Sequence, residues 1–573
     1  MIKAKVPAQN KAARLRDYEA TRRDFSWTKA EEYFTWSRTG RVNAAFEAVD
    51  RWAADEERRD HPALVFEKAG RISIFTYQDL KEKSSRLANL LVAHGFGRGD
   101  LLFIFLPPCP ERYLAILACA RLGAVCCPLY PNLNYHELEV RLENGRPQAL
   151  LTHPLLAEVL PVESMSGVGQ VFYTENPLPG LFRREAALPG NLEKMGAEHE
   201  CVFVERHEPL YLLYTSGSTG PPKGVVHAHG DLVGPLVTGR WVLDLGPEDV
   251  LWTDGDPAWV TGTVYGVFTP WLIGATSVVQ GDPYSASTWY RTLERHQVTV
   301  WYTTSSSLSG LAEAGDDLPG RYNLSALRHV ATVGETLAPE LFYWTRKNLG
   351  LSPHETWWMT ETGMICLANF PSQPIKPGSM GRPVPGVEAA VLDEKGEPLP
   401  LLTLGELALR QGWPAMMSGI WRDQDRYEEY FRFEGWFVTG DMALMDEEGY
   451  FFHQGRNDDL IKVEEKLVGP FEVEHVLVRH PAVNEAAVIS KTVEAKKPFI
   501  KAFVTLRRGF PPSARLKQEI KEFVKANMSS EIPLKEVTFL DELPKTLSGK
   551  LLRRVLRARE LELPAGDVSK MKS

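Results

Sequence analysis

The sequence has few cysteines, and they are not arranged for a disulfide framework or a zinc site. Six cysteines occur in 573 residues, and none of them forms a C-x-x-C pair. Several have small or apolar neighbours, as Cys119, Cys126 and Cys127 do. Isolated cysteines in apolar segments are typical of reduced thiols in a protein core. We therefore expect a protein with core thiols and a cytoplasmic location.

Long apolar runs are absent as well. A helix that spans a bilayer needs about 20 consecutive apolar residues, whereas the longest runs, such as residues 101–106, have only the length of a strand. The first residues are largely polar, which predicts no signal peptide. The formal net charge is −9, and nucleic-acid binders usually carry a basic surplus. The sequence therefore predicts neither membrane insertion nor nucleic-acid binding.

No internal repeat or low-complexity segment organises the chain, yet its 573 residues exceed what one hydrophobic core usually holds. Helical and strand patterns alternate, which predicts an α/β fold. Residues 76–95 predict a helix that Thr76 caps and Gly95 ends. Residues 101–106 then predict a buried strand, and a second helix and strand follow over residues 111–129. This order favours a mostly parallel sheet.

A smaller α+β unit is expected near the C-terminus. Residues 485–506 contain two predicted strands, and Ser513 begins an amphipathic helix. A polar, glycine-containing break at residues 455–459 follows a short aromatic strand and predicts the seam between two domains. We expect an N-terminal domain over residues 1–457 and a C-terminal domain over residues 458–573.

The most informative segment is the loop Tyr-Thr-Ser-Gly-Ser-Thr-Gly-Pro-Pro-Lys-Gly over residues 214–224. Its glycines free the backbone to curl, and its hydroxyls and backbone N–H groups can donate to phosphate oxygens. The spacing is not that of a Walker A motif, so a P-loop NTPase is not implied. A plain surface connection would rarely be so rich in hydroxyls before a lysine. The predicted phosphate-binding residues are Thr215, Ser216, Gly217, Ser218, Thr219 and Lys223.

This loop resembles the signature of the adenylate-forming superfamily, which includes acyl-CoA synthetases, luciferases and the adenylation domains of peptide synthetases. Five further motifs follow in the order of that superfamily, at residues 333–336, 357–363, 439–441, 455–459 and 544–550. Within the superfamily the sequence is most similar to short bacterial acetyl-CoA synthetases. The resemblance implies a large N-terminal adenylation domain of several subdomains and a smaller, mobile α+β C-terminal domain.

The resemblance also implies a reaction. A short-chain carboxylate such as acetate would react with ATP to give acyl-AMP and pyrophosphate, and the acyl group would then pass to coenzyme A. Two anions meet in the first step, so catalysis depends mainly on charge neutralisation and positioning. By resemblance Lys550 would contact the α-phosphate and carboxylate, Glu361 would bind Mg²⁺, and Thr360 would contact phosphate. Acylation of Lys550 would remove that charge.

The resemblance assigns the remaining nucleotide contacts as well. Asp441 would accept hydrogen bonds from the ribose hydroxyls, and Arg456 would contact ribose or phosphate. The other residues expected beside the nucleotide are Gly334, Glu335, Thr336, Glu355, Thr356 and Trp357.

The size of the acyl group would be set by Trp358, which in this family closes the pocket just beyond a methyl group. Val260, Thr261 and Val333 match the other pocket positions of the family. A packed indole excludes longer chains because protein interiors yield little. Asp458 matches the hinge about which the small domain would rotate between the two half-reactions.

Two segments depart from the family pattern. Near residues 464–467, Glu465 replaces a glycine that leaves room for the pantetheine chain, and Leu467 replaces an arginine expected to reach phosphate. Residues 303–307, Thr-Thr-Ser-Ser-Ser, replace an Ala-Pro-Thr-Ala-like run. The first departure puts thioester formation in more doubt than adenylation.

Three interpretations follow. The first is an AMP-forming acetate–CoA ligase. The second is an adenylating enzyme that prefers propionate or another small acid, or that has a modified thioester step because of Glu464, Glu465 and Leu467. One extra methylene often changes discrimination by only about 1–3 kcal/mol, so propionate stays open. The third is a catalytically weak nucleotide-binding protein with a regulatory role, which the retained Lys550 and Glu361 disfavour.

Overall fold

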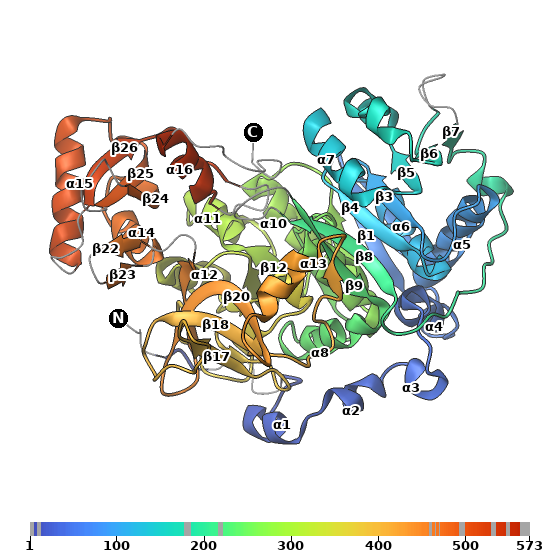
Figure 1. Cartoon of the computed structure of the whole chain (residues 1–573), viewed down its shortest axis with the longest axis horizontal. Helices are drawn as coiled ribbons and strands as arrows, with labels where there is room; N and C mark the ends of the chain where they lie inside the picture. The colour runs from blue at the N-terminus through green and yellow to red at the C-terminus, as the bar shows by residue number, and fades with distance from the viewer. Residues whose placement is uncertain are drawn as a thin grey trace. The chain divides into compact units, whose positions relative to one another are not determined.

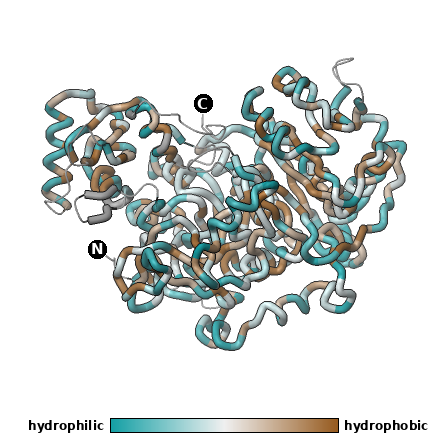
Figure 2. The backbone as a smooth tube through the Cα atoms, in the orientation of Figure 1, coloured by the Kyte–Doolittle hydropathy of each residue, from teal (hydrophilic) through white to brown (hydrophobic). Residues whose placement is uncertain are grey.

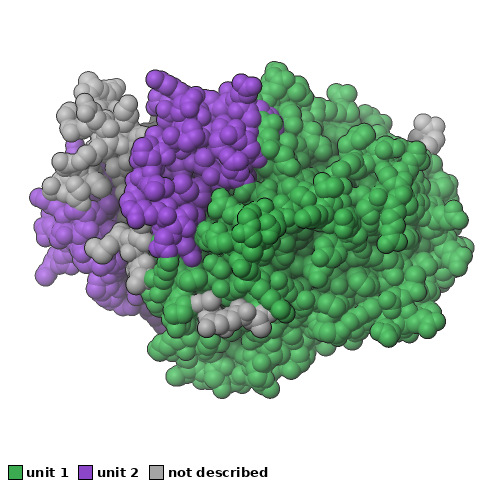
Figure 3. Space-filling view, turned by 90° about the horizontal axis from the view of Figure 1, so that it is seen from below, with its two compact units in different colours: residues 1–215, 222–387, 411–429 green, residues 216–221, 388–410, 430–573 purple. Residues whose placement is uncertain are grey.

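The computed structural model describes residues 5–7, 13–176, 185–215, 222–457, 461–463, 466–468, 470–491, 499–528, 534–545 and 551–561. The chain divides into two compact units (Figure 3). Unit 1 comprises residues 1–215, 222–387 and 411–429, and unit 2 comprises residues 216–221, 388–410 and 430–573. The domain boundary after residue 457 stays a prediction.

Two large sheets form the body of unit 1 (Figure 1). In the described residues the first sheet has nine strands, and its inner strands are parallel. In sheet order they are β16 (Arg382–Pro383), β15 (Leu367–Ala368), β14 (His354–Trp357), β13 (His329–Val333), β12 (Val300–Thr304), β10 (Val250–Thr253), β11 (Thr276–Gln280), β1 (Pro62–Lys68) and β2 (Arg71–Thr76).

The second sheet has eight strands in the described part of the chain. In sheet order they are β19 (Gly419–Ile420), β9 (Lys223–Ala228), β8 (Pro209–Thr215), β4 (Val125–Leu129), β3 (Leu101–Phe105), β5 (Ala149–Thr152), β6 (Gln170–Tyr173) and β7 (Glu185–Ala187). The strands from β8 to β7 are parallel, whereas β9 and β19 run antiparallel to their neighbours.

The helices of unit 1 lie along these sheets and at their edges (Figure 1). They are α1 (Tyr18–Asp24), α2 (Trp27–Glu31), α3 (Trp36–Thr39), α4 (Arg51–Ala53), α5 (Tyr77–Ala93), α6 (Glu111–Leu122), α7 (Tyr135–Gly145), α8 (Val233–Trp241), α9 (Thr269–Ile273), α10 (Ala286–Arg295), α11 (Ser305–Glu313), α12 (Pro339–Leu349) and α13 (Gln424–Glu428).

The local sequence signals for the first helix and strand are confirmed. The Thr76 side chain accepts a hydrogen bond from the Asp79 amide and completes a capping box at the start of α5. Gly95 follows the helix with φ +82°, a conformation that glycine adopts without steric cost. Every residue of β3 is buried, as its uninterrupted apolar run predicts. Apolar residues along such strands form the brown stretches in Figure 2.

Unit 2 contains three smaller sheets in its described residues. One is antiparallel, with β17 (Ala389–Leu392), β18 (Gly405–Arg410), β20 (Trp436–Met445) and β21 (Phe451–Arg456). The others are the pair β22 (Ile461–Val463) and β23 (Lys466–Val468), and the sheet of β24 (Val483–Lys491), β25 (Phe499–Leu506) and β26 (Leu534–Phe539). Its helices are α14 (Pro470–Val478), α15 (Ala514–Asn527) and α16 (Arg553–Leu561).

The C-terminal elements form the expected α+β arrangement. The Ser513 side chain caps α15, whose buried Leu516, Ile520 and Val524 pack on the sheet of β24 to β26. The aromatic strand before the predicted seam is longer than expected. It continues through Gly455 to Arg456, because Gly455 takes φ +118° at a register shift opposite Met442 and keeps the pairing with β20.

No helix in the described ranges combines the length and apolar character required to cross a membrane. The described cysteines are all free thiols, and Cys119, Cys126, Cys127 and Cys366 are buried. Cys109 and Cys201 are only partly buried, so they are not members of the core in the strict sense.

A buried histidine of unit 1 makes the stability of the fold sensitive to acid. His229 is fully buried, its Nδ1 accepts a hydrogen bond from the Ala44 amide, and burial lowers its pKa to about 3. The unfolded chain binds a proton near pH 6.5, whereas the folded chain does not. The stabilising contribution is therefore complete above pH 6.5 and is lost as the pH falls from 6.5 towards 3.

Replacing His229 by asparagine tests this linkage, since the Asn amide oxygen can still accept the Ala44 amide. Between pH 7 and pH 5 we expect wild type to lose about 2 kcal/mol more unfolding free energy than His229→Asn. Urea unfolding at both pH values measures the difference. The control is His136→Asn, because the His136 side chain is 80% exposed. Equal pH dependence in wild type and His229→Asn would contradict the prediction.

Candidate active site

The predicted phosphate loop connects two neighbouring strands of the eight-stranded sheet. β8 ends at Thr215 and β9 begins at Lys223, and these two residues are direct partners across the antiparallel pair. The loop ends are therefore held side by side by the sheet. The Thr215 hydroxyl oxygen is buried and has no hydrogen-bond partner among the described residues, so it is available to a ligand. The predicted loop residues Ser216, Gly217, Ser218 and Thr219 lie outside the described residues.

The first residue of β9 forms an ion pair with the predicted magnesium ligand. Lys223 Nζ lies 2.5 Å from Glu361 Oε1, and the two side chains are only 12% and 5% exposed. Glu361 lies in the single helical turn η8 (Thr360–Thr362), whose residues are buried. Lys223 and Glu361 are 138 positions apart in the sequence, and only the family resemblance predicted that they act together. In the structure they are in contact where the phosphate loop ends.

A buried histidine fixes the turn that carries Thr360 and Glu361. His227 Nε2 donates to the Thr360 carbonyl over 2.7 Å, and His227 Nδ1 lies 2.9 Å from Asp231 Oδ2. The Glu361 carbonyl accepts from the Met417 amide. Because His227 follows Lys223 on the same strand, β9 holds both the cation and the support of the turn. β9 therefore contacts both the Glu361 carboxylate and the turn that carries it.

Trp358 is fixed by a chain of buried hydrogen bonds. Its indole Nε1 donates to the Tyr302 hydroxyl over 2.9 Å, and that hydroxyl lies 2.7 Å from Thr356 Oγ1. The Thr356 hydroxyl in turn donates to the Thr332 carbonyl, so the Tyr302 hydroxyl is the donor to Thr356. Tyr265 also meets the indole edge to face, with ring centroids 5.0 Å apart. An indole held on two sides is a rigid wall.

The other predicted pocket residues are buried near the ends of neighbouring elements. Val260 and Thr261 precede the π-helical turn η6 (Gly262–Phe268), and Val333 ends β13. The Thr261 and Thr332 hydroxyl oxygens are buried without a hydrogen-bond partner in the described part of the chain. A buried hydroxyl without a hydrogen-bond partner destabilises a protein unless a ligand or water bonds to it. These two hydroxyls are therefore available to a molecule bound in the pocket.

The predicted adenine-side residues lie in β14 and in the loop after β13, its parallel neighbour. Gly334 has φ +86°, and a Cβ there would lie 3.0 Å from the Trp259 ring, so both conformation and space favour glycine. Glu355, Thr356 and Trp357 belong to β14 and are buried. Burial raises the pKa of Glu355 well above its usual range. Thr336 lies in the loop after β13.

The departing segment at residues 303–307 has a structural role. Ser306 donates from its amide and its hydroxyl to the Glu335 carboxylate, at 3.0 Å and 2.8 Å. The hydroxyls of Thr303 and Ser307 both donate to Asp254 Oδ2, at 2.8 Å and 2.6 Å. Burial raises the pKa of Asp254, and these hydroxyls stabilise its charged form. The hydroxyl-rich run therefore holds two carboxylates at the start of α11.

The predicted ribose residues form their own cluster in unit 2. Asp441 on β20 pairs with Arg456 on β21, and Arg456 Nη1 donates to Asp441 Oδ1 over 2.9 Å. The same Nη1 donates to the Thr439 carbonyl over 3.0 Å. Gly440 has φ +72°, and a Cβ there would lie 2.7 Å from Arg456 Nη2. The glycine is thus required for the guanidinium to pass close to the backbone.

Several predicted residues lie outside the description of the structure. Lys550, Asp458, Glu464 and Glu465 are not among the described residues. Leu467 belongs to the short strand β23, which pairs with β22. Roles for these residues stay predictions.

The structure also contains three supporting residues that the sequence alone did not indicate: His227, Tyr265 and Tyr302. His227 and Tyr302 lie on strands, and an apolar strand pattern does not predict which polar group such a residue will contact. Only His227 could have been suspected from the sequence, because it closely follows Lys223.

The buried Glu361 carboxylate would suit a Mg²⁺ whose other ligands come from substrate phosphates and waters. No group of three or more His, Cys, Asp or Glu side chains suited to a metal occurs among the described residues. Glu361 presents one buried carboxylate beside Lys223. Mg²⁺ is commonly bound by one or two carboxylates together with substrate phosphates and waters, so this donor set suits it.

Comparison with solved structures places the fold in a class of CoA ligases. A structure described as the anthranilate CoA ligase AuaEII in complex with anthranoyl-AMP superposes with a TM-score of 0.83 and 27% identity, covering 91% of this chain and 98% of that one. A Brucella canis acyl-CoA synthetase gives a TM-score of 0.74 at 28% identity, covering 95% of this chain and 99% of that one.

The sequence comparisons agree. The profile of the AMP-binding enzyme family matches residues 50–421, and that of its C-terminal domain matches residues 472–550. An acetyl-coenzyme A synthetase of Bacillus subtilis is 44% identical and covers 99% of both chains. One of Methanothrix thermoacetophila is 36% identical, covering 94% of this chain and 86% of the relative. This chain belongs to the AMP-binding enzyme family.

Proposed function

We propose that this protein is an AMP-forming acetate–CoA ligase. The observation that carries the proposal is the 44% identity with an acetyl-coenzyme A synthetase along 99% of both chains. Acetate would be activated to acetyl-AMP with release of pyrophosphate, and coenzyme A would then displace AMP. The position of Trp358 favours a very small acyl group as substrate, because an indole fixed on two sides cannot move aside for a longer chain.

In the proposed adenylation step, the phosphate loop and Lys223 would hold the triphosphate of ATP. Glu361 would hold Mg²⁺, which would supply positive charge against the phosphates when bound. Lys223 already faces this point, and an arriving phosphate would take over part of its pairing with Glu361. Thr215 would donate its unpaired hydroxyl to the same phosphates. Thr360 would contact phosphate from the turn that His227 fixes.

Positioning of the two reactants would fall to the buried residues of unit 1. Val260, Thr261 and Val333 would surround the methyl group of acetate, and Trp358 would close the end of the pocket. Holding the carboxylate oxygen in line with the α-phosphate makes the reaction effectively unimolecular. Lys550 would neutralise the charge that the attack brings together.

The remaining assignments concern unit 2 and the second half-reaction. Asp441 would accept hydrogen bonds from the ribose hydroxyls, and Arg456, which already pairs with Asp441, would orient that carboxylate. Asp458 would serve as the hinge between domains 1–457 and 458–573, so that the smaller one could rotate before coenzyme A reacts. The cytoplasmic location and acylation of Lys550 remain predictions.

Release of AMP with acetate, propionate and butyrate, each with and without coenzyme A, tests the proposal. We expect the highest kcat/KM with acetate and sustained turnover only with coenzyme A. Acetate-dependent exchange between ATP and pyrophosphate reports adenylation alone, and Lys550→Ala should abolish it. Exchange that does not need acetate would refute the proposal. Acetate-dependent exchange without CoA-dependent turnover would instead show that adenylation is intact and that the thioester step is modified.

A further inference from the structure

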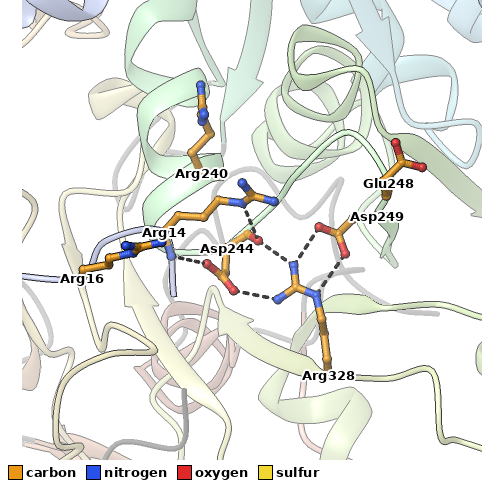
Figure 4. A pocket seen from close by; sticks show the side chains of 7 residues that line it. All are labelled: Arg14, Arg16, Arg240, Asp244, Glu248, Asp249 and Arg328. Atoms are coloured by element: carbon orange, nitrogen blue, oxygen red, sulfur yellow. Dashed lines mark hydrogen bonds and ion pairs between the residues drawn. The ribbon is translucent and has the colours of Figure 1, made fainter. Parts of the chain in front are cut away.

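Unit 1 has a charged pocket with a volume of about 520 Å³ (Figure 4). This volume lies in the range of small-molecule sites. The pocket lies at the amino ends of the parallel strands of the nine-stranded sheet, because Asp249 directly precedes β10 and Arg328 directly precedes β13. The candidate active site follows the carboxyl end of β13, at Val333. The two sites thus lie at opposite ends of the strand β13.

The floor of the pocket is rigid. Arg328 donates to Asp244 Oδ2 over 2.7 Å and to Asp249 through two nitrogens, at 3.0 Å and 2.7 Å. Asp249 also accepts the Thr299 hydroxyl over 2.7 Å. Asp244 adopts φ +55°, in the left-handed region that aspartate enters more readily than most other residues with a side chain. Its carboxylate and carbonyl bind Arg328 and Arg14, and these contacts hold the conformation (Figure 4).

Each carboxylate of the pocket has an arginine partner, although Asp244 and Asp249 share the single charge of Arg328, whereas three arginines of the lining have no carboxylate partner among the described residues. Asp244 and Asp249 pair with Arg328, and Glu248 pairs with Arg58 outside the lining. No ion pair with a carboxylate joins any of the remaining lining arginines in the described part of the chain; these are Arg14, Arg16 and Arg240.

Two of these arginines are held in place without being neutralised. Arg14 Nε donates to the Asp244 carbonyl over 3.3 Å, and its guanidinium lies where a Cβ on Gly246 would clash. The Arg240 guanidinium lies 4.9 Å from the centre of the Tyr33 ring. Supported guanidinium groups lose little freedom when they bind a ligand, and their forked donors match the oxygens of phosphate. A protein with net charge −9 thus has a local positive site.

We propose that this pocket is a second ligand site, which binds a phosphate-bearing small molecule apart from the candidate active site. The phosphate group would lie among Arg14, Arg16 and Arg240, while the paired Arg328 and its carboxylates would form the floor. The pocket is larger than one phosphate ion needs, so a phosphate monoester of an organic molecule fits it better than inorganic phosphate does. The proposal does not depend on which acid the enzyme activates.

Calorimetric titration of the full chain in a chloride buffer tests the proposal, with ribose 5-phosphate and inorganic phosphate as probes. We expect wild type to bind ribose 5-phosphate more tightly than phosphate. Arg14→Ala combined with Arg240→Ala should weaken ribose 5-phosphate at least tenfold. Arg16→Glu should also weaken it, and this exposed residue makes no described contact whose loss would unfold the chain. Arg41→Ala combined with Arg71→Ala removes two other exposed arginines and should leave binding unchanged.

The double variant Lys223→Met, Glu361→Gln separates the two sites, because it alters the candidate active site without leaving a buried charge unpaired. Binding that persists in this variant and is lost in the Arg14, Arg240 double variant supports the proposal. The proposal is overturned if wild type binds neither probe at millimolar concentration, if both arginine variants bind as wild type does, or if Lys223→Met, Glu361→Gln abolishes binding.

Discussion

Replacing Trp358 by glycine is expected to convert a preference for acetate into one for longer acids. The indole is 7% exposed and is fixed by the Tyr302 hydroxyl and the Tyr265 ring. Removing it opens a volume that propionate and butyrate can fill. Selection by one or two methylenes amounts to about 10–200-fold, so the ratio of kcat/KM for butyrate to that for acetate should rise at least tenfold.

Tyr302→Phe tests whether the hydrogen bond to the indole matters. It leaves the buried indole N–H without its acceptor, which costs about 1–3 kcal/mol and loosens the wall. An intermediate change in chain-length preference is expected. Tyr290→Phe is the matched control, because the buried Tyr290 hydroxyl has no hydrogen-bond partner among the described residues. If Trp358→Gly keeps the wild-type preference, Trp358 does not limit the acyl pocket.

The ion pair between Lys223 and Glu361 is expected to contribute to both catalytic activity and folding stability. Glu361→Gln should lower kcat/KM by about 10²–10³-fold, because the carboxylate that would hold Mg²⁺ loses its charge. Lys223→Ala should destabilise unit 1 by about 3–5 kcal/mol, since it removes the cation that pairs with the buried Glu361 carboxylate.

The double variant Lys223→Met, Glu361→Gln separates the two effects. Both charges are gone, so urea unfolding should return to within about 1 kcal/mol of wild type, whereas exchange between ATP and pyrophosphate should stay as low as in Glu361→Gln. Lys347→Met is a control that breaks an exposed pair with Asp316 and should change neither quantity. Full exchange activity in the double variant would show that the pair does not bind the triphosphate.

Local sequence signals predicted elements well where backbone chemistry determines them. Thr76 and Gly95 determine the ends of α5 because a capping hydroxyl and a left-handed glycine act over a few residues. The end of β21 was predicted too early, because pairing with β20 carries the strand through Gly455 to Arg456. Such pairing depends on a partner strand that the local pattern does not contain.

In the candidate site, too, local features could be predicted from the sequence, whereas contacts between distant segments could not. The glycine- and hydroxyl-rich composition of the phosphate loop was visible in the sequence, but the proximity of Lys223 to Glu361 rests on a contact between distant segments. The Tyr302 hydroxyl has a role only because Trp358 and Thr356 reach it from another strand. The sequence showed only that residues 303–307 depart from the family pattern, whereas the structure shows that their hydroxyls cap α11 and bind two carboxylates.

The strand that carries Lys223 completes its pairing late during synthesis. β9 pairs with β8 on one side and with β19, at Gly419–Ile420, on the other. While the ribosome is still translating the intervening residues, the outer edge of β9 exposes backbone N–H and C=O groups that have no partner strand. An open strand edge in a nascent chain favours association between polypeptides. Newly made chains that stall before residue 419 should therefore aggregate or recruit chaperones, whereas chains in which residues 419–420 have left the ribosome can close this edge themselves.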